Sequence, residues 1–186
     1  MSTQIERRLF TIDDCDKMGE AGILLPDERV ELINGELFVV KPTGPRHGAA
    51  VDGTIHAFVR LVGDQAIVRV QGCVVLHQMA APLPDIALLA SREDRYVSKN
   101  PGPDDILLLV EVSDSTLAFD SIVKLQLYAI TGIREYWIAD LRNDRLLVHL
   151  EPNGDVYATV KELHRGDSVA PASLPDCRIP VDLLLP

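Results

Sequence analysis

The alternation of apolar and polar positions predicts two long helices among many short strands. Residues 44–63 and 119–130 show the helical period. The second segment is apolar around most of its circumference, with one narrow polar sector. A shorter helix is predicted from Thr11, whose side chain can cap it. The apolar stripe of the first long helix consists of Val51, Ile55, Phe58 and Val62.

Strands are predicted wherever short apolar runs are bounded by turn residues. Residues 29–40 form a hairpin around Asn34-Gly35, the preferred pair for a tight turn with positive backbone angles. The other predicted strands are IVRV (67–70), CVVLHQ (73–78), DIALLA (85–90), ILLLVEVS (106–113), REYWIAD (134–140), RLLVHLE (145–151) and VYATVKEL (156–163). The order of elements indicates an α/β (α+β) fold with a central mixed sheet flanked by helices. The length and the lack of a linker predict a single domain over residues 1–186.

One strand carries a carboxylate among apolar residues. Strict alternation places Glu111 on the face of Leu107, Leu109 and Ser113, opposite Ile106, Leu108, Val110 and Val112. Both faces are apolar, which predicts a central strand that is covered on both sides. A buried ionised carboxylate is costly unless a cation or hydrogen bonds compensate it. Glu111 is therefore a site residue, the partner of a structural arginine, or a residue at the open end of the strand.

Asp85 begins the neighbouring apolar strand, directly after Pro84. Alone, it has an ordinary structural explanation, because Pro-Asp commonly opens a strand or a turn. Beside Glu111, it would be repelled unless the two carboxylates shared a divalent cation. Mg²⁺ or Mn²⁺ fits such a pair, since hard cations prefer oxygen ligands, few carboxylates and several waters.

Lys124 lies in the polar sector of the second long helix. One interpretation is an exposed stripe in which Asp120 and Lys124 pair at i,i+4. In the other, the stripe faces a cleft and Lys124 reaches the metal site. There, a lysine could position the attacking water or stabilise the charge that develops on the phosphorus, while the metal polarises the phosphodiester. The sector consists of Asp120, Ser121, Lys124 and Tyr128.

Charge and composition narrow the choice of partners. The net charge of -10 argues against non-specific coating of nucleic acid, because that binding depends on many Lys and Arg contacts to phosphate. Bases outnumber acids over residues 41–99, where we expect any contact with a polyanion. The three scattered cysteines fit neither a disulfide framework nor a zinc cluster. Without a membrane-length apolar run or a secretory pattern, we expect a cytoplasmic protein.

The order and spacing of these motifs resemble the PD-(D/E)xK nuclease superfamily, which has the restriction-endonuclease-like fold. The residues that carry this resemblance are Pro84-Asp85 and then Glu111-Val112-Ser113 in the next strongly apolar strand. The chain is more closely similar to a bacterial family of predicted restriction endonucleases that is expanded in cyanobacteria. That resemblance runs from about Glu28 to Asp140, through ERVELINGEL, PRH, PDIALL, LLLVEVSDST, the helix with Lys124, and GIREYWIAD.

The resemblance implies that Asp85 and Glu111 are metal ligands, with the Val112 carbonyl a further candidate. The superfamily's lysine sits two residues after the glutamate, where this chain has Ser113. The closer family usually takes its lysine from the following helix, which points to Lys124.

Glu31 and His47 are further candidates for the site. Glu31 faces away from its neighbours in the hairpin strand, and the resemblance places it near the metal; an exposed glutamate is the alternative. His47 lies at the start of a helix, one turn before Val51, so it faces inward. It is either a hydrogen-bonding residue at the helix start or a general acid or base.

These residues together predict a Mg²⁺- or Mn²⁺-dependent DNA endonuclease that hydrolyses phosphodiester bonds. One alternative is a nuclease fold retained for binding or assembly, which the acidic charge and Ser113 favour. Another is a metal-dependent hydrolase that acts on a small phosphoester. A homodimer is expected of an enzyme that cuts both strands, although no sequence feature demands one.

Overall fold

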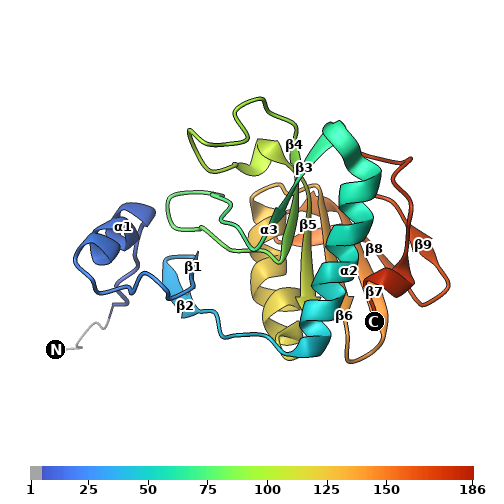
Figure 1. The fold of residues 1–186 in the computed structure, drawn as a ribbon. Coiled ribbons are helices and arrows are strands. Elements are labelled where there is room, and N and C mark those ends of the chain that lie inside the picture. Colours follow the sequence, from blue (N-terminus) through green and yellow to red (C-terminus); the bar gives the residue numbers. More distant parts are fainter. Residues whose placement is uncertain (1–5) are drawn as a thin grey trace.

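A six-stranded mixed sheet in the order β3-β4-β5-β6-β7-β8 forms the centre of the computed structural model, which describes residues 6–186 (Figure 1). β5 and β6 are parallel, and every other neighbouring pair in this sheet is antiparallel. The strands are β3 (Ala66–Val70), β4 (Ile86–Ala90), β5 (Ile106–Ser113), β6 (Glu135–Asp140), β7 (Arg145–Asn153) and β8 (Val156–Leu163). The predicted α/β fold with a central mixed sheet is confirmed.

Helices cover the two faces of this sheet (Figure 1). α2 (Pro45–Val62) packs Phe58 near Trp137 of β6 in one buried cluster. On the other face, a π-helical turn over Phe119–Lys124, the wide turn, continues into α3 (Leu125–Ile130). The rings of Tyr128 and Tyr136 meet edge to face there, at 4.9 Å between centroids. The chain therefore buries β5 from both sides, as its two apolar faces predict.

The N-terminal segment consists of a helix and a hairpin at one edge of the molecule (Figure 1). α1 (Ile12–Glu20) is capped by Thr11, which exchanges hydrogen bonds with Asp14 in a capping box. β1 (Val30–Ile33) and β2 (Glu36–Val39) pair antiparallel around Asn34 and Gly35, both at positive φ. Backbone bonds join Leu32 to Ala81, so the hairpin is fixed to the segment before β4.

The strand predicted at residues 73–78 is wrong. This segment bonds to three different parts of the chain, because Val74 donates to Pro82, Val75 to Pro101 and Leu76 to Ala80. Pro82 and Pro101 have no N–H, so neither of these two partners can return a ladder bond from its own nitrogen. Apolar content alone does not distinguish such a buried connection from a strand.

The prediction of which side chains share a face of β5 is correct only beyond a β-bulge near the start of the strand. Leu88 pairs with Leu108 but Leu89 pairs with Ile106, so β5 has one extra residue at this step. As a result, Ile106 joins Leu109 in the cluster on the α3 side, whereas Leu107 packs against the α2 side. From Leu108 to Ser113 the side chains alternate strictly between the two faces, and this alternation directs Glu111 toward α3.

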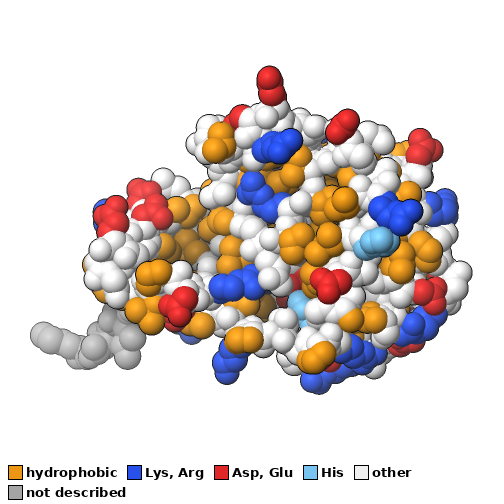
Figure 2. Space-filling view, viewed as in Figure 1, with side chains coloured by type: hydrophobic (Ala, Val, Ile, Leu, Met, Phe, Trp, Pro, Cys, Tyr) orange, Lys and Arg blue, Asp and Glu red, His pale blue; other side chains and the backbone are white. Residues whose placement is uncertain are grey.

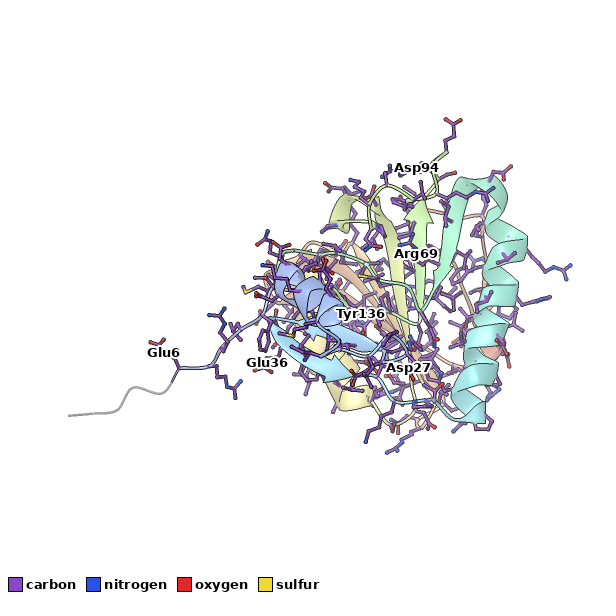
Figure 3. All side chains as sticks on the ribbon, turned by 60° about the vertical axis from the view of Figure 1, so that its left-hand side comes forward. Glu6, Asp27, Glu36, Arg69, Asp94 and Tyr136 are labelled. Atoms are coloured by element: carbon purple, nitrogen blue, oxygen red, sulfur yellow. The ribbon has the colours of Figure 1, made fainter. Side chains whose placement is uncertain are left out.

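The remaining chain contains little regular structure. The loop over residues 91–105, which carries Asp94, extends from the sheet and ends in a short 3₁₀ turn (Pro103–Asp105) (Figure 3). After β8, the tail contains only β9 (Ser168–Val169), β10 (Ile179–Pro180) and a 3₁₀ turn (Val181–Leu183); another 3₁₀ turn (Gly63–Gln65) directly follows α2. Within residues 6–186, no helix has the length and apolar character needed to cross a membrane.

Gly53 marks a close approach between α2 and the tail. A Cβ added there would lie 2.3 Å from the carbonyl oxygen of Leu183, and backbone cannot yield as a flexible side chain can. We expect Gly53→Ala to lower the free energy of unfolding by about 1–3 kcal/mol, despite the better helix propensity of alanine. Urea denaturation measures this change. Gly48→Ala, in the same helix with open space around it, should instead stabilise by up to about 1 kcal/mol; equal effects at both sites would contradict the steric explanation.

Candidate active site

A pocket of about 380 Å³ opens at the carboxyl end of β5. It is lined by all five of the predicted metal-binding and catalytic residues, although these come from β1, α2, β5, the wide turn and the segment just before β4. Tertiary structure therefore brings together side chains that are up to 93 positions apart (124 − 31). The predicted site residues that line the pocket are Glu31, His47, Asp85, Glu111 and Lys124.

Lys124 lies between two buried carboxylates. Its Nζ is 2.9 Å from Glu111 Oε1 and 2.9 Å from Glu31 Oε1. The phenol of Tyr128, one turn further along the helix, donates to the same Glu111 oxygen at 3.0 Å. Lys124 is only 5% exposed and lines the pocket, so the exposed-stripe interpretation is wrong. That the lysine serves a metal site stays a prediction.

Glu31 belongs to the hairpin and is buried against the segment that precedes β4. The side chain is 4% exposed, and its Oε1 accepts a bond from the Leu83 backbone N–H at 2.7 Å. Strand alternation within β1 directs it to the pocket. The alternative of an exposed hairpin glutamate is therefore wrong.

Asp85 is held by three donors at the start of β4. The Val112 backbone N–H donates to Oδ2 at 2.9 Å, and His47 Nε2 lies 3.0 Å from the same oxygen. Gln71 donates to Oδ1 at 3.2 Å and itself accepts a bond from Arg29 at 2.9 Å. The Asp85 backbone N–H in turn donates to Glu111 Oε2 at 3.4 Å, which ties the two acids together across adjacent strands.

His47 is the third residue of α2, after Pro45 at the first position. Proline is well suited there because its missing N–H would have no partner in the helix. The imidazole is 6% exposed and faces inward, as predicted. Because the Asp85 carboxylate only accepts, Nε2 carries the proton of this contact. Nδ1 is buried without any hydrogen-bond partner, and it is the sole side-chain atom in that condition among residues 6–186.

Burial and crowding of acids govern the charges in the pocket. Burial raises the pKa of Glu111 well above its ordinary value, and Lys124 opposes that rise. The nearby carboxylates of Asp120, Asp85 and Glu31 add to it. Burial alone would lower the pKa of Lys124, but the surrounding acids outweigh it and raise that pKa. The ammonium group is therefore charged at neutral pH.

Asp85 behaves differently from Glu111. Burial raises its pKa, but the hydrogen bond and charge of His47 outweigh this effect, with help from the Val112 N–H and Gln71. The net pKa of Asp85 is lowered, so this carboxylate is ionised at neutral pH. The site thus combines one firmly ionised acid with one whose charge is costly.

The donor set suits a hard divalent cation that keeps most of its own waters. Within residues 6–186, no three His, Cys, Asp or Glu side chains converge to hold a metal. Asp85 and Glu111 offer two carboxylates, and Mg²⁺ is commonly held by one or two carboxylates plus waters and substrate phosphates. The pocket carries more acidic than basic groups around these two residues, which also favours a cation.

Three residues of the site escaped the sequence reasoning. Tyr128 and Asp120 belong to the polar sector of the helix, which was the signal that could have found them. Gln71 gave no signal, because its contact with Asp85 depends on the turn after β3, where Gln71 has positive φ. Asp120 is 3% exposed and lines the pocket beside Lys124.

The fold is that of a mixed α/β protein with a six-stranded central sheet and a pocket at the end of β5. The family model described as "Putative restriction endonuclease" (Uma2) matches residues 20–182, and the chain belongs to this family. The predicted resemblance to a family of restriction endonucleases is thereby confirmed.

The fold is also similar to a crystal structure of a putative nuclease belonging to DUF820 from Anabaena variabilis ATCC 29413. The TM-score is 0.71 with 16% sequence identity, over 94% of this chain and 97% of that chain. No curated protein matches the chain.

Proposed function

We propose that this protein is a Mg²⁺- or Mn²⁺-dependent endonuclease that hydrolyses phosphodiester bonds in DNA, with a PD-(D/E)xK site in which the lysine comes from a helix. One observation carries the proposal: Lys124 reaches Glu111 within 2.9 Å, in the pocket that also contains Asp85. A lysine is thus available although Ser113 occupies its usual place. Asp85 and Glu111 would hold the cation, which would polarise the phosphodiester and lower the pKa of a bound water.

The other residues of the pocket have separate roles in this proposal. Lys124 would orient the attacking water or stabilise the charge that develops on the phosphoryl group. Glu31 keeps the ammonium group in place from the opposite side, and His47 orients the carboxylate of Asp85. On the face shown in Figure 2, basic side chains are scattered rather than gathered in one patch, which favours local contacts with a short stretch of DNA.

Plasmid nicking tests the proposal. We expect the purified protein to nick supercoiled DNA with Mg²⁺ or Mn²⁺, and EDTA to stop the reaction. Asp85→Asn should reduce the rate by at least about 100-fold, because it removes a charged ligand. Asp140→Asn is the matched control, since Asp140 is a completely buried aspartate outside the pocket, whereas the Asp85 side chain is 13% exposed. Nicking without a divalent cation, or nicking that survives Asp85→Asn, would contradict the proposal.

His47→Ala should weaken the metal site without removing a ligand. Asp85 would lose one of its three donors, and such supporting contacts typically change metal affinity by about 10- to 100-fold. Calorimetric titration with Mn²⁺ measures the effect. His56→Ala, on the same helix but exposed, should bind Mn²⁺ like the wild type. An unchanged Mn²⁺ affinity in His47→Ala would show that His47 has only a packing role.

A non-catalytic binding or assembly module is the second candidate. It is favoured because Lys124 is already paired with two carboxylates and Asp85 already accepts from three donors, as in a closed structural network. The same Mn²⁺ titration separates the two functions. A binding heat that disappears in Asp85→Asn supports the metal-dependent enzyme, whereas the absence of binding supports the module.

A further inference from the structure

Ser113 has a specific contact in this structure. It is the last residue of β5, and its side chain is completely buried. Its hydroxyl donates to Asp120 Oδ2 at 2.7 Å, and the hydroxyl of Thr116 donates to the same oxygen at 2.6 Å. The end of β5, the following loop and the wide turn therefore converge on one carboxylate oxygen, an arrangement we name the Asp120 clamp (Ser113, Thr116 and Asp120).

Asp120 is held through its backbone as well. Its carbonyl accepts the bond from the Leu125 N–H that closes the wide turn, and the hydroxyl of Tyr136 donates to the same carbonyl at 3.1 Å. Tyr136 belongs to β6, the parallel neighbour of β5. Isolated π-helical turns are rare and frequently occur at functional sites. Here, Ser113 of β5 and Tyr136 of β6 both bond to Asp120 and so fix the wide turn at this residue.

Lys124 is the last residue of that turn, so its backbone position depends on how the turn is held. A lysine side chain has a flexible four-carbon stem and loses much rotamer freedom when it is buried. Its Nζ nevertheless lies 2.9 Å from each of two carboxylates. That geometry requires the start of the helix to be fixed relative to Glu111 on β5.

We infer that Asp120 is a positioning residue for Lys124. The hydroxyls of Ser113 and Thr116 fix the wide turn to the end of β5, and the turn places the ammonium group between Glu31 and Glu111. Ser113, at the expected lysine position, thus secures the helix that supplies the lysine instead. The catalytic meaning of this inference rests on the proposed function; the placement of Lys124 does not.

Nuclease kinetics test the inference first. Asp120→Ala and Ser113→Ala should each lower kcat by about 10- to 100-fold, because small displacements of a reacting group are costly. KM should stay within about twofold, since neither Asp85 nor Glu111 is altered. Asp120→Asn should retain most of the activity, because its amide oxygen still accepts from both hydroxyls. Thr116→Val and Thr116→Ser form a milder matched pair at an exposed position, and only the valine variant should lose activity.

A double-mutant cycle with Lys124→Met tests the placement without any need for activity. Ser113→Ala should shift the urea midpoint clearly in the wild type but much less when Lys124 is absent, because the contacts that depend on the clamp are already gone. Equal shifts in both backgrounds would overturn the inference, as would full nuclease activity in both Asp120→Ala and Ser113→Ala. If Ser113→Ala and Lys124→Met are coupled in their effects on stability but the protein does not cut DNA, the inference is supported and the proposed function fails.

Discussion

Glu111→Gln is expected to abolish metal-dependent cleavage of DNA while leaving the protein folded. The substitution removes one of the two carboxylates offered to the cation, and metal assistance contributes several kcal/mol to such reactions. Since each 1.36 kcal/mol corresponds to a factor of ten, the rate should fall by about 1,000-fold or more. Initial rates of plasmid nicking and Mn²⁺ calorimetry on the same preparations measure the two effects.

The fold should tolerate Glu111→Gln because of the local contacts. The glutamine oxygen can still accept from Lys124 and Tyr128, and Lys124 keeps Glu31 as a charged partner. Glu135→Gln is the control, because Glu135 is an equally buried acid on β6 that holds Trp137 and Ala172 outside the pocket. It should cut DNA at the wild-type rate. Cleavage by Glu111→Gln at a comparable rate would refute the role of Glu111.

Lys124→Met should have the largest effect on stability of any change in the pocket. It leaves Glu31 and Glu111 buried without their shared cation, and breaking a buried ion pair by removing one partner costs about 3–5 kcal/mol. Urea denaturation measures the loss, and cleavage should disappear as well. Lys161→Met, at an exposed position on β8, should change stability by less than about 0.5 kcal/mol. Similar losses in the two variants would show that the pairing in the pocket is not the cause.

The loss in Lys124→Met should also depend on pH. Burial already raises the pKa of Glu111 in the folded protein, and removing Lys124 raises it further. A group whose pKa is raised on folding favours the folded state below its unfolded pKa, and this stability is lost as pH rises through the folded pKa. The variant should therefore be closer to the wild type at about pH 5 than at about pH 8. A destabilisation that is constant over this range would contradict the explanation.

Local features of the fold could be predicted because neighbouring residues decide them. Asn34-Gly35 favours positive φ, and Thr11 with Asp14 satisfies the first N–H groups of α1, so the hairpin and this helix start are visible in the sequence. The segment at residues 73–78 was mistaken for a strand because its partners lie at Ala80, Pro82 and Pro101. A sequence pattern does not show which distant backbone groups a segment will meet.

The candidate site was predictable to the extent that burial makes a charge expensive. A carboxylate in the apolar run of β5 and a lysine in an almost wholly apolar helix were both anomalous, and the structure places them 2.9 Å apart. Gln71 carried no comparable anomaly, and Asp120 was marked solely by its place in the polar sector of the same helix. Their roles depend on the positive φ after β3 and on the wide turn, which result from packing.

The sequence by itself determined most of the elements, the apolar setting of Glu111 and its pairing with Asp85 as a candidate, because hydrophobic periodicity and the cost of burying charge act on local patterns. Only the tertiary structure decided that Lys124 faces the pocket, that Glu31 pairs with Lys124 there, and that Ser113 bonds to Asp120 at the start of the helix. These contacts depend on the register of β5, its bulge and the wide turn. A shift of one residue in β5 or in the wide turn would point each following side chain in another direction. The contacts in the pocket are therefore fixed only when the sheet and its helices pack together.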